Sequence, residues 1–204
     1  MGHVKKLWFR EFLRIVYDIY GLYLDSTYGF ISINKLIVKS QKEIAKHSKI
    51  DISDLNKQNF YYGKGPPDNK DSHIMYISKI GEVRERNKKN GRNFRNIANF
   101  CLVLIYQYWE DYYREKIAND IDIEKESLKL DIFGDIRILR KSIIHHRAKA
   151  LEEVEKCNLL KWFKKGDEIN INNEKFVIII NYIFNSIYND ISEEYKKYGY
   201  TNVK

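Results

Sequence analysis

The sequence predicts an all-α fold, a helical bundle with additional N-terminal helices, in a single domain of 204 residues. Three observations predict it. With only 2 Pro and 10 Gly, the chain has too few turn residues for the short strands of a sandwich or barrel. Hydrophobic residues make up 44% and charged residues 31%, which is the composition of a chain that folds. Apolar residues recur at spacings of three and four over long stretches, as on one face of a helix.

The first half of the chain is predicted to hold two helices followed by a long loop. Apolar residues recur every three or four positions over residues 4–24 and again over residues 33–44, which is the helical pattern. The polar cluster at residues 25–29 is expected to interrupt this pattern and to separate the two helices. Between residues 51 and 72 the pattern dissolves into Asn, Lys, Gly and Asp around Pro66–Pro67, so a surface loop is predicted there.

A further long helix is predicted from about Asn93 to Ala118, with an apolar face wide enough for the centre of a bundle. Residues 82–95, which lead into this helix, form the most basic window of the chain. Such a window is typical of a solvated helix end, and also of a strip that contacts phosphate groups. The candidate phosphate-binding cations of this window, which would bind RNA if the partner is a nucleic acid, are Arg84, Arg86, Lys88, Lys89, Arg92 and Arg95.

Two more helices complete the predicted bundle. The first of them follows the boundary at residues 131–135, where Asp135 is expected to act as the cap, and continues to about Lys156. The last helix runs from Glu174 to roughly Tyr195 and carries an apolar stripe. Residues 165–173, between these helices, are expected to form a short extended turn.

Charge and cysteine content limit the partners and the compartment. A net charge of +8 at a pI near 9.2 favours an anionic partner such as nucleic acid. Cys101 and Cys157 lie far apart in apolar surroundings, so we expect small buried hydrophobes in a reducing cytoplasm. An apolar run such as residues 176–180 is far too short for a membrane span. The histidines lack the spacing of a zinc site, and no metal or cofactor is expected.

One stretch, Arg140–His145, differs from the other titratable residues in its placement on a helix. The apolar stripe that faces the core consists of Ile132, Ile136, Leu139 and Ile143. Arg140 flanks that stripe, and His145 lies about 140° further round at about 100° per residue. A single helix therefore presents both side chains at the edge of a groove. A second copy of the helix, from another subunit, would place two Arg and His sets across one cleft.

At these residues the sequence resembles the HEPN superfamily, whose signature is an Arg followed after four to six residues by a His, on the third helix of a four-helix bundle. Arg140–His145 matches the four-residue spacing. Residues 135–140 resemble the acidic and apolar lead-in of bacterial members, and residues 162–169 resemble the turn before their last helix. The resemblance divides the single domain, 1–204, into N-terminal helices and a loop (1–92) and a HEPN-like core (93–196).

The resemblance implies a metal-independent endoribonuclease that cleaves single-stranded RNA. It implies a cytoplasmic homodimer, away from membranes, that acts in toxin–antitoxin or antiviral defence. An antitoxin or another regulatory protein is the further partner that such a context implies.

The resemblance assigns the catalytic roles to Arg140 and His145. RNA supplies its own nucleophile, the 2′-hydroxyl, so the enzyme has to supply proton transfer and positive charge. Histidine suits proton transfer near neutral pH, and arginine clamps phosphate oxygens in a fork. Lys141 and Ser142 are expected to support phosphate binding, with Arg147 as a further RNA-binding cation. His146 stands at five-residue spacing, so the choice between the two neighbouring histidines stays open.

Lys141 departs from the family pattern, because this position usually holds a small polar residue, often Asn. Arg147 stands where the branch with nucleotidyltransferase partners has a Tyr, so modification of such a Tyr is not expected. Two other interpretations stay open. The histidines can be polar flank residues bonded to backbone or to Glu152 or Glu153, with Arg140 in an ordinary ion pair. Alternatively, the chain is a non-catalytic helical module that binds nucleic acid or regulates a partner.

Overall fold

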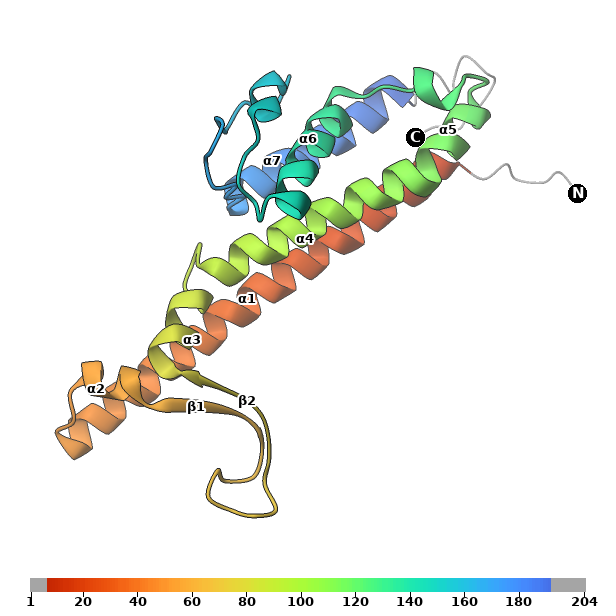
Figure 1. Ribbon diagram of the computed structural model, residues 1–204. Helices are drawn as coiled ribbons and strands as arrows, with labels where there is room; N and C mark the ends of the chain where they lie inside the picture. Colours follow the sequence, from red (N-terminus) through yellow and green to blue (C-terminus); the bar gives the residue numbers. More distant parts are fainter. Residues whose placement is uncertain (1–6, 192–204) are drawn as a thin grey trace, which may run out of the picture. The chain divides into compact units, whose positions relative to one another are not determined.

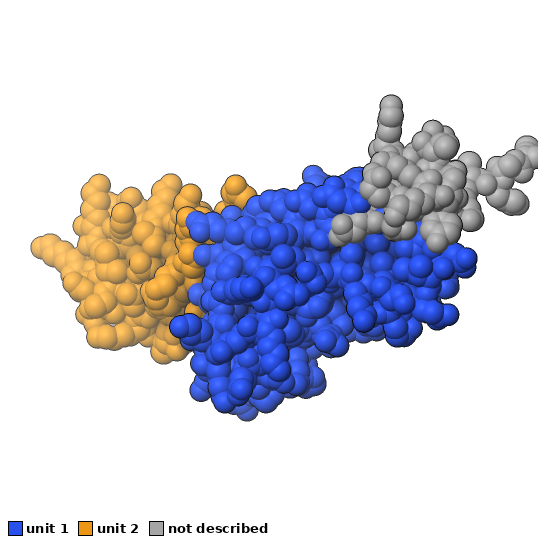
Figure 2. All heavy atoms as spheres, turned by 90° about the horizontal axis from the view of Figure 1, so that it is seen from above, with its two compact units in different colours: residues 1–23, 97–204 blue, residues 24–96 orange. Residues whose placement is uncertain are grey.

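The computed structural model describes residues 7–191, without the side chain of residue 190. The predicted helix start at Val4 and the predicted helix end near Tyr195 lie outside this range. The predicted mainly helical class is confirmed, and the described chain adds one two-stranded antiparallel sheet. The chain divides into two compact units, residues 1–23 with 97–204 and residues 24–96 (Figure 2).

Helix α1 (Trp8–Ser48) is one continuous helix, so the predicted interruption at residues 25–29 is wrong. The buried positions continue across the polar cluster at helical spacing, with Tyr23, Thr27, Ile37 and Gln41 all buried. The Thr27 hydroxyl donates a hydrogen bond to the carbonyl of Leu24 (2.9 Å) within the helix. The Thr27 hydroxyl is therefore satisfied within the helix, and the buried positions on both sides of the polar cluster keep one face of the helix packed.

The second unit contains a β-hairpin where a loop was predicted. Its elements after α1 are α2 (Ile52–Lys57), β1 (Asn59–Lys64), β2 (His73–Lys79) and α3 (Ile80–Asn87). Asp51 caps α2, since its carboxylate accepts a hydrogen bond from the Ser53 amide (2.7 Å). Residues 65–72, at the end of the hairpin away from α2 and α3 (Figure 1), keep the predicted loop character. The sequence did not predict the strands. Most of their residues are exposed, so the strands lack the alternation of apolar and polar residues that marks a half-buried strand.

The first unit is built from four helical segments. After the first part of α1 come α4 (Arg92–Tyr108), the π-helical turn η1 (Trp109–Tyr113) and α5 (Arg114–Asp120), which together form the predicted helix near residues 93–118. The remaining elements are η2 (Lys125–Ser127), α6 (Asp131–His145), η3 (Glu152–Lys156), α7 (Asn173–Ser186) and η4 (Ile187–Ile191). None of the described helices is long and apolar enough to cross a membrane.

Aromatic side chains join these four segments in one core. Phe12 of α1 packs against Trp109 of η1 and Phe133 of α6, with ring centroids 5.4 and 5.7 Å away. Trp109 and Phe133 are themselves stacked at 4.1 Å. Tyr23 of α1 packs against Phe176 of α7 at 4.3 Å. The beginning of α1 therefore belongs to the core that holds α6 in place.

The bounds of α6 correct two predictions. The helix begins at Asp131, so Asp135 lies one turn inside it and is not its cap. It ends at His145 instead of continuing to Lys156. The backbone of Arg147 and Ala148 is left-handed, with φ of 52° and 61°, a conformation that ends a right-handed helix. The His145–His146 pair therefore lies at the end of a helix.

Both cysteines are free and buried, as predicted. Burial raises the pKa of the Cys101 thiol to about 11, and burial with the nearby charge of Asp135 raises that of Cys157 to about 12.

We expect neither thiol to react with Ellman's reagent at pH 8 in the native protein, and both to react in denaturant. The thiolate is the reactive form, and a pKa of about 11 leaves roughly one thiol in 10³ ionised at pH 8. The measurement is the absorbance of released thionitrobenzoate against time. Rapid release of one equivalent from native protein would contradict the buried placement.

Candidate active site

The core-facing side of α6 fixes the direction of its exposed residues. Ile132, Ile136 and Leu139 are fully buried, and Ser142 continues their stripe with no exposed surface. The Ser142 hydroxyl accepts a hydrogen bond from the amide of Leu151 (3.1 Å). Ser142 therefore anchors the segment after the helix and faces away from solvent. This placement does not fit the expected contact between Ser142 and a phosphate.

Arg140 lies half-buried beside α4. Its Nη2 donates to Oε1 of Gln107 (3.1 Å), and its guanidinium carbon lies 5.4 Å from the centroid of the Tyr106 ring. The Arg140 Nε is buried without a hydrogen-bond partner among the described residues, and no ion pair to Arg140 is present there. The guanidinium is thus positioned by neutral groups, and its charge is not cancelled by a carboxylate.

Tyr106 supports Arg140 as a neutral ring. Burial, followed by the nearby charge of Glu110, raises the pKa of the Tyr106 hydroxyl, although Arg137, Arg114 and Arg140 oppose the shift. The phenol is therefore protonated at neutral pH. A cation over the face of such a ring is stabilised by about 0.5–2 kcal/mol, which favours one position for the Arg140 side chain.

The His145–His146 pair is exposed at the end of α6. The His146 amide still donates to the Ser142 carbonyl (3.1 Å), and the Lys149 amide donates to the carbonyl of His146 (2.9 Å). These bonds fix the backbone on both sides of the pair. The structure does not distinguish the two histidines as proton-transfer groups, so the alternative between them stays open.

The turn after the histidines is held in a strained conformation. Arg147 and Ala148 adopt left-handed backbone angles without being glycine, which costs on the order of 1 kcal/mol for each residue. The Ala148 carbonyl accepts from the Ile169 amide (2.7 Å), and Ala150 exchanges backbone bonds with Asp167 and Gly166 (both 2.8 Å). These contacts bind the turn to residues 166–169, the region predicted to form an extended turn. Such over-determined strain is concentrated at functional sites in proteins.

Lys141 points to the segment after the helix. Its Nζ forms an ion pair with Oε1 of Glu153 on η3 at 2.8 Å, and both side chains are about half exposed. The hydrogen bond from Lys141 holds the pKa of the Glu153 carboxyl below its usual range. The positive charge of Lys141 is therefore partly neutralised in this conformation. Glu153 meets Lys141 rather than a histidine, in contrast to the flank-residue interpretation of the motif.

Arg84, expected to contact RNA, is instead part of a polar network inside the second unit. Its Nη1 donates to Gln41 of α1 (2.9 Å) and to Asn56 of α2 (3.1 Å), and Asn34 donates to its carbonyl (2.8 Å). Gln41 and Asn56 are also bonded to each other at 3.0 Å. Arg84 thus connects α1, α2 and α3 through these hydrogen bonds.

The other cations of the basic window differ in their availability. Arg86 bonds to hydroxyl groups of the hairpin, Lys88 pairs with Glu85, and Arg95 is half-buried with a partner. Lys89 and Arg92 are exposed and form no ion pair within residues 7–191. All of them belong to the second unit, whereas Arg147 belongs to the first.

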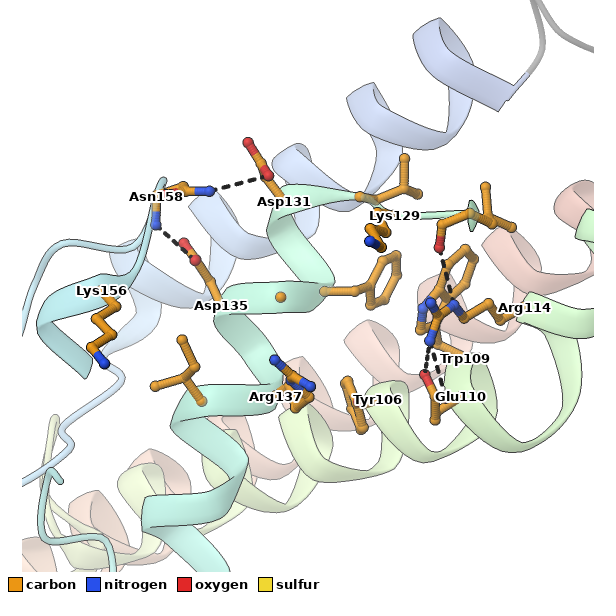
Figure 3. A pocket seen from close by; sticks show the side chains of 15 residues that line it. Tyr106, Trp109, Glu110, Arg114, Lys129, Asp131, Asp135, Arg137, Lys156 and Asn158 are labelled. Carbon is orange, nitrogen blue, oxygen red and sulfur yellow. Dashed lines mark hydrogen bonds and ion pairs between the residues drawn. The ribbon is translucent and has the colours of Figure 1, made fainter. Parts of the chain in front are cut away.

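A pocket of about 350 Å³ opens beside the first half of α6. Figure 3 shows it between α6 and the segment around η1, with the Arg114–Glu110 pair on one side and Asp131 with Asn158 on the other. Tyr106, the ring beneath Arg140, forms part of its wall. Arg140 and His145 do not line this pocket.

Sequence reasoning missed this pocket because its cations come from separate segments. Arg114 begins α5, Lys129 precedes α6, Arg137 lies on α6, and Lys156 ends η3. No spacing rule relates these four positions, and only the fold brings them together. The local signal was the apolar stripe through Ile136 and Leu139, which leaves Arg137 on the exposed side of the helix.

Within the described part of the chain, no three His, Cys, Asp or Glu side chains lie together in a way that could hold a metal ion. No family model matches the chain, and neither a curated protein nor a solved structure matches it significantly.

Proposed function

We propose that the chain is an endoribonuclease of the HEPN type, which cleaves single-stranded RNA through attack of the 2′-hydroxyl and without a metal ion. The observation that carries the proposal is the guanidinium of Arg140, which lies over Tyr106 without an ion pair to any described residue, on the helix that ends at the His145–His146 pair. A cation that is fixed by neutral partners is ready to receive an anion. The resemblance of Arg140–His145 to the HEPN signature supports the same assignment.

Arg140 is proposed to stabilise the charge that develops on the phosphate. An arginine presents paired N–H donors that match two phosphate oxygens. One Nη already contacts Gln107, which sets the plane of the guanidinium and leaves other donors for the substrate. Groups that are positioned before the reaction stabilise the transition state without a reorganisation cost.

The histidines are proposed to transfer the protons. One neutral imidazole accepts the proton of the 2′-hydroxyl as its oxygen attacks the phosphorus. A second, protonated imidazole donates its proton to the 5′-oxygen as the phosphorus–oxygen bond to that oxygen breaks. The products are a 2′,3′-cyclic phosphate and a 5′-hydroxyl, so all atoms and protons are accounted for.

Two imidazoles with different protonation states are most simply supplied by two copies of the chain. Exposed apolar residues flank Arg140 on both helices: Leu104 lies one turn before Gln107 on α4, and Ile144 lies one turn after Arg140 on α6, with 38% and 45% of their surfaces exposed. A two-fold dimer that buries this surface would place Arg140 and His145 of both copies across one cleft. The proposed active form is therefore a homodimer.

The proposed chemistry predicts cleavage of labelled single-stranded RNA in the presence of EDTA. An oligonucleotide with a single 2′-deoxy nucleotide at the scissile position should resist cleavage there, because the nucleophile is missing. The measurement is gel electrophoresis of the products, with the cyclic phosphate identified by its conversion to a monophosphate in acid. A single-stranded DNA of the same sequence is the matched control.

Loss of cleavage in EDTA, or equal cleavage of the DNA, would show that the reaction uses other chemistry. Binding of RNA without cleavage would favour the second candidate, a non-catalytic nucleic-acid-binding module. The ion pair of Lys141 with Glu153, at the position next to Arg140, is the observation that favours this second candidate, because it replaces the usual small polar residue by a neutralised charge.

A further inference from the structure

The positive charge of the protein is concentrated in the second unit. Residues 24–96 hold fifteen Lys and Arg against eight Asp and Glu, whereas the rest of the chain holds twenty-one against twenty. Nearly all of the net charge of +8 therefore belongs to residues 24–96. An anionic partner is attracted to this unit first, because the field of clustered charges acts over a Debye length of about 10 Å.

The β-hairpin of this unit exposes aromatic and apolar side chains that a two-stranded sheet cannot bury by itself. Tyr61 and Ile77 are register partners and are 40% and 50% exposed. Tyr76, the register partner of Tyr62, is 53% exposed, and Met75 is 70% exposed. Exposed apolar surface of this kind marks an interaction site.

Arg86 of α3 fixes two of the aromatic rings. Its guanidinium donates to the hydroxyls of Tyr62 (3.0 Å) and Tyr76 (3.4 Å) and to that of Ser78 (3.2 Å). The guanidinium carbon lies 5.9 and 5.6 Å from the two ring centroids. Arg86 forms no ion pair with a carboxylate among the described residues, so a positive charge sits beside two positioned tyrosine rings. Phe60 extends this aromatic row, 4.9 Å from the ring of Tyr62.

Exposed cations of the same unit lie in the hairpin and in the turn that follows α3. Lys64 ends β1, and Lys70 lies in the loop that joins the strands. Lys89 and Arg92 flank the turn between α3 and α4, where Gly91 is required because a side chain would come within 2.6 Å of the Glu85 carbonyl. None of these four cations forms an ion pair within residues 7–191, so their charge is available to phosphates.

We infer that the β1–β2 hairpin and the turn at residues 88–92 form a binding surface for single-stranded RNA. Unpaired cations contact the phosphates, and the rings of Tyr62 and Tyr76 stack with bases. Stacking requires unpaired bases, which excludes a regular duplex as the preferred ligand. An acidic protein would use the cations but would gain nothing specific from rings held by Arg86, so RNA is the partner that accounts for both features.

The choice of RNA over DNA rests on the proposed function, but the binding surface does not. The test therefore uses the full chain with Arg140→Ala, which is designed to bind substrate without cleaving it. Fluorescence anisotropy of a labelled 12-nucleotide RNA, an illustrative length of about one single-strand site, gives the dissociation constant at several salt concentrations.

Two variants in this background separate stacking from charge. Tyr76→Ala should weaken binding by about 5-fold to 100-fold, the usual effect of losing one stacked base, without changing the salt dependence. Tyr76→Phe, which keeps the aromatic ring, should lose less RNA affinity than Tyr76→Ala. Lys89→Gln with Arg92→Gln should lower the slope of log affinity against log salt by about 1.4, since each phosphate contact contributes about 0.7 for single strands.

The control is Lys161→Gln with Lys164→Gln, which removes the same charge from exposed positions of the first unit. This pair should change the dissociation constant by less than about twofold. Far-UV circular dichroism and thermal melting show whether each variant is folded. If Tyr76→Ala and the pair Lys89→Gln with Arg92→Gln bind RNA as tightly as the parent, or if the control pair loses as much affinity as they do, the inference is wrong.

Three further outcomes separate the alternatives. Equal binding of duplex RNA would overturn the stacking role of the tyrosines. Competition by polyglutamate as strong as that by RNA would show that the surface is built for an acidic protein. If the chain with native Arg140 never cleaves RNA while hairpin-dependent binding persists, the proposed function fails and the RNA-binding surface stands.

Discussion

Replacing Arg140 by alanine is expected to lower the rate of RNA cleavage at saturating substrate by about 10² to 10³, the usual cost of removing a donor that stabilises transition-state charge. Arg140→Lys should recover only part of the rate, because an ammonium lacks the forked geometry. His145→Ala should lower the cleavage rate by a factor of about 10² to 10⁴, the range for a general acid or base. The measurement is single-turnover cleavage of labelled RNA by each variant.

Arg137→Ala is the matched control for Arg140→Ala. Both residues are arginines on α6, one turn apart, but Arg137 lines the pocket beside the first half of the helix and is not part of the proposed machinery. It should retain cleavage within about threefold. His146→Ala should lower the cleavage rate less than His145→Ala does. A larger loss at His146 would move the proton-transfer role to that residue, and an unchanged rate in Arg140→Ala would remove the basis of the proposed site.

Replacing Asp135 by alanine is expected to lower the free energy of unfolding by about 2–4 kcal/mol. The Asp135 carboxylate is 2% exposed and accepts hydrogen bonds from the amides of Asn158 (2.8 Å), Leu159 (2.7 Å) and Leu160 (2.7 Å). Its removal leaves these donors without an acceptor in an enclosed region, and each unsatisfied group costs about 1–3 kcal/mol. The energies do not add fully, because water can reach the partly buried amides.

Chemical denaturation followed by circular dichroism measures this loss. Asp131→Ala is the control, since the exposed Asp131 makes one longer bond, 3.2 Å, to the Asn158 side chain, and it should cost less than about 1 kcal/mol. The loss of unfolding free energy in Asp135→Asn should lie between the losses in Asp131→Ala and Asp135→Ala, because the side-chain amide keeps one acceptor oxygen. Equal stability of Asp135→Ala and Asp131→Ala would show that the three amide bonds contribute little.

The role of Asp135 shows how local sequence reasoning failed at one residue. An aspartate before an apolar helical pattern is typically a cap, and that interpretation needs only neighbouring residues. In the structure Asp135 accepts from amides more than twenty residues later in the chain. Partners at such a distance are decided by the packing of η3 and the following segment against α6, which no local pattern encodes.

Residue type and spacing predicted the helices that carry a strong apolar periodicity and the exposed side of α6. The segment from α4 to α5, the start of α7 and the burial of both cysteines follow from residue type and spacing, because the helical period places every third or fourth residue on one face. The same periodicity places Arg140 beside the buried stripe. It could not reveal the support of Arg140 by Gln107 and Tyr106, since these residues lie on another helix.

The continuity of α1, the hairpin and the end of α6 depend on contacts made only in the folded protein. Gln41 of α1 is buried and bonds to Asn56 and Arg84, contacts that local periodicity does not express. The two strands pair with each other and do not pack on a core. Tyrosines therefore stand at exposed positions, and the sequence lacks the alternation of apolar and polar residues that identifies a half-buried strand. The left-handed turn at Arg147–Ala148 is held by bonds to residues 166–169. In each case the deciding free energy comes from groups distant in sequence, whose proximity exists only once the chain has folded.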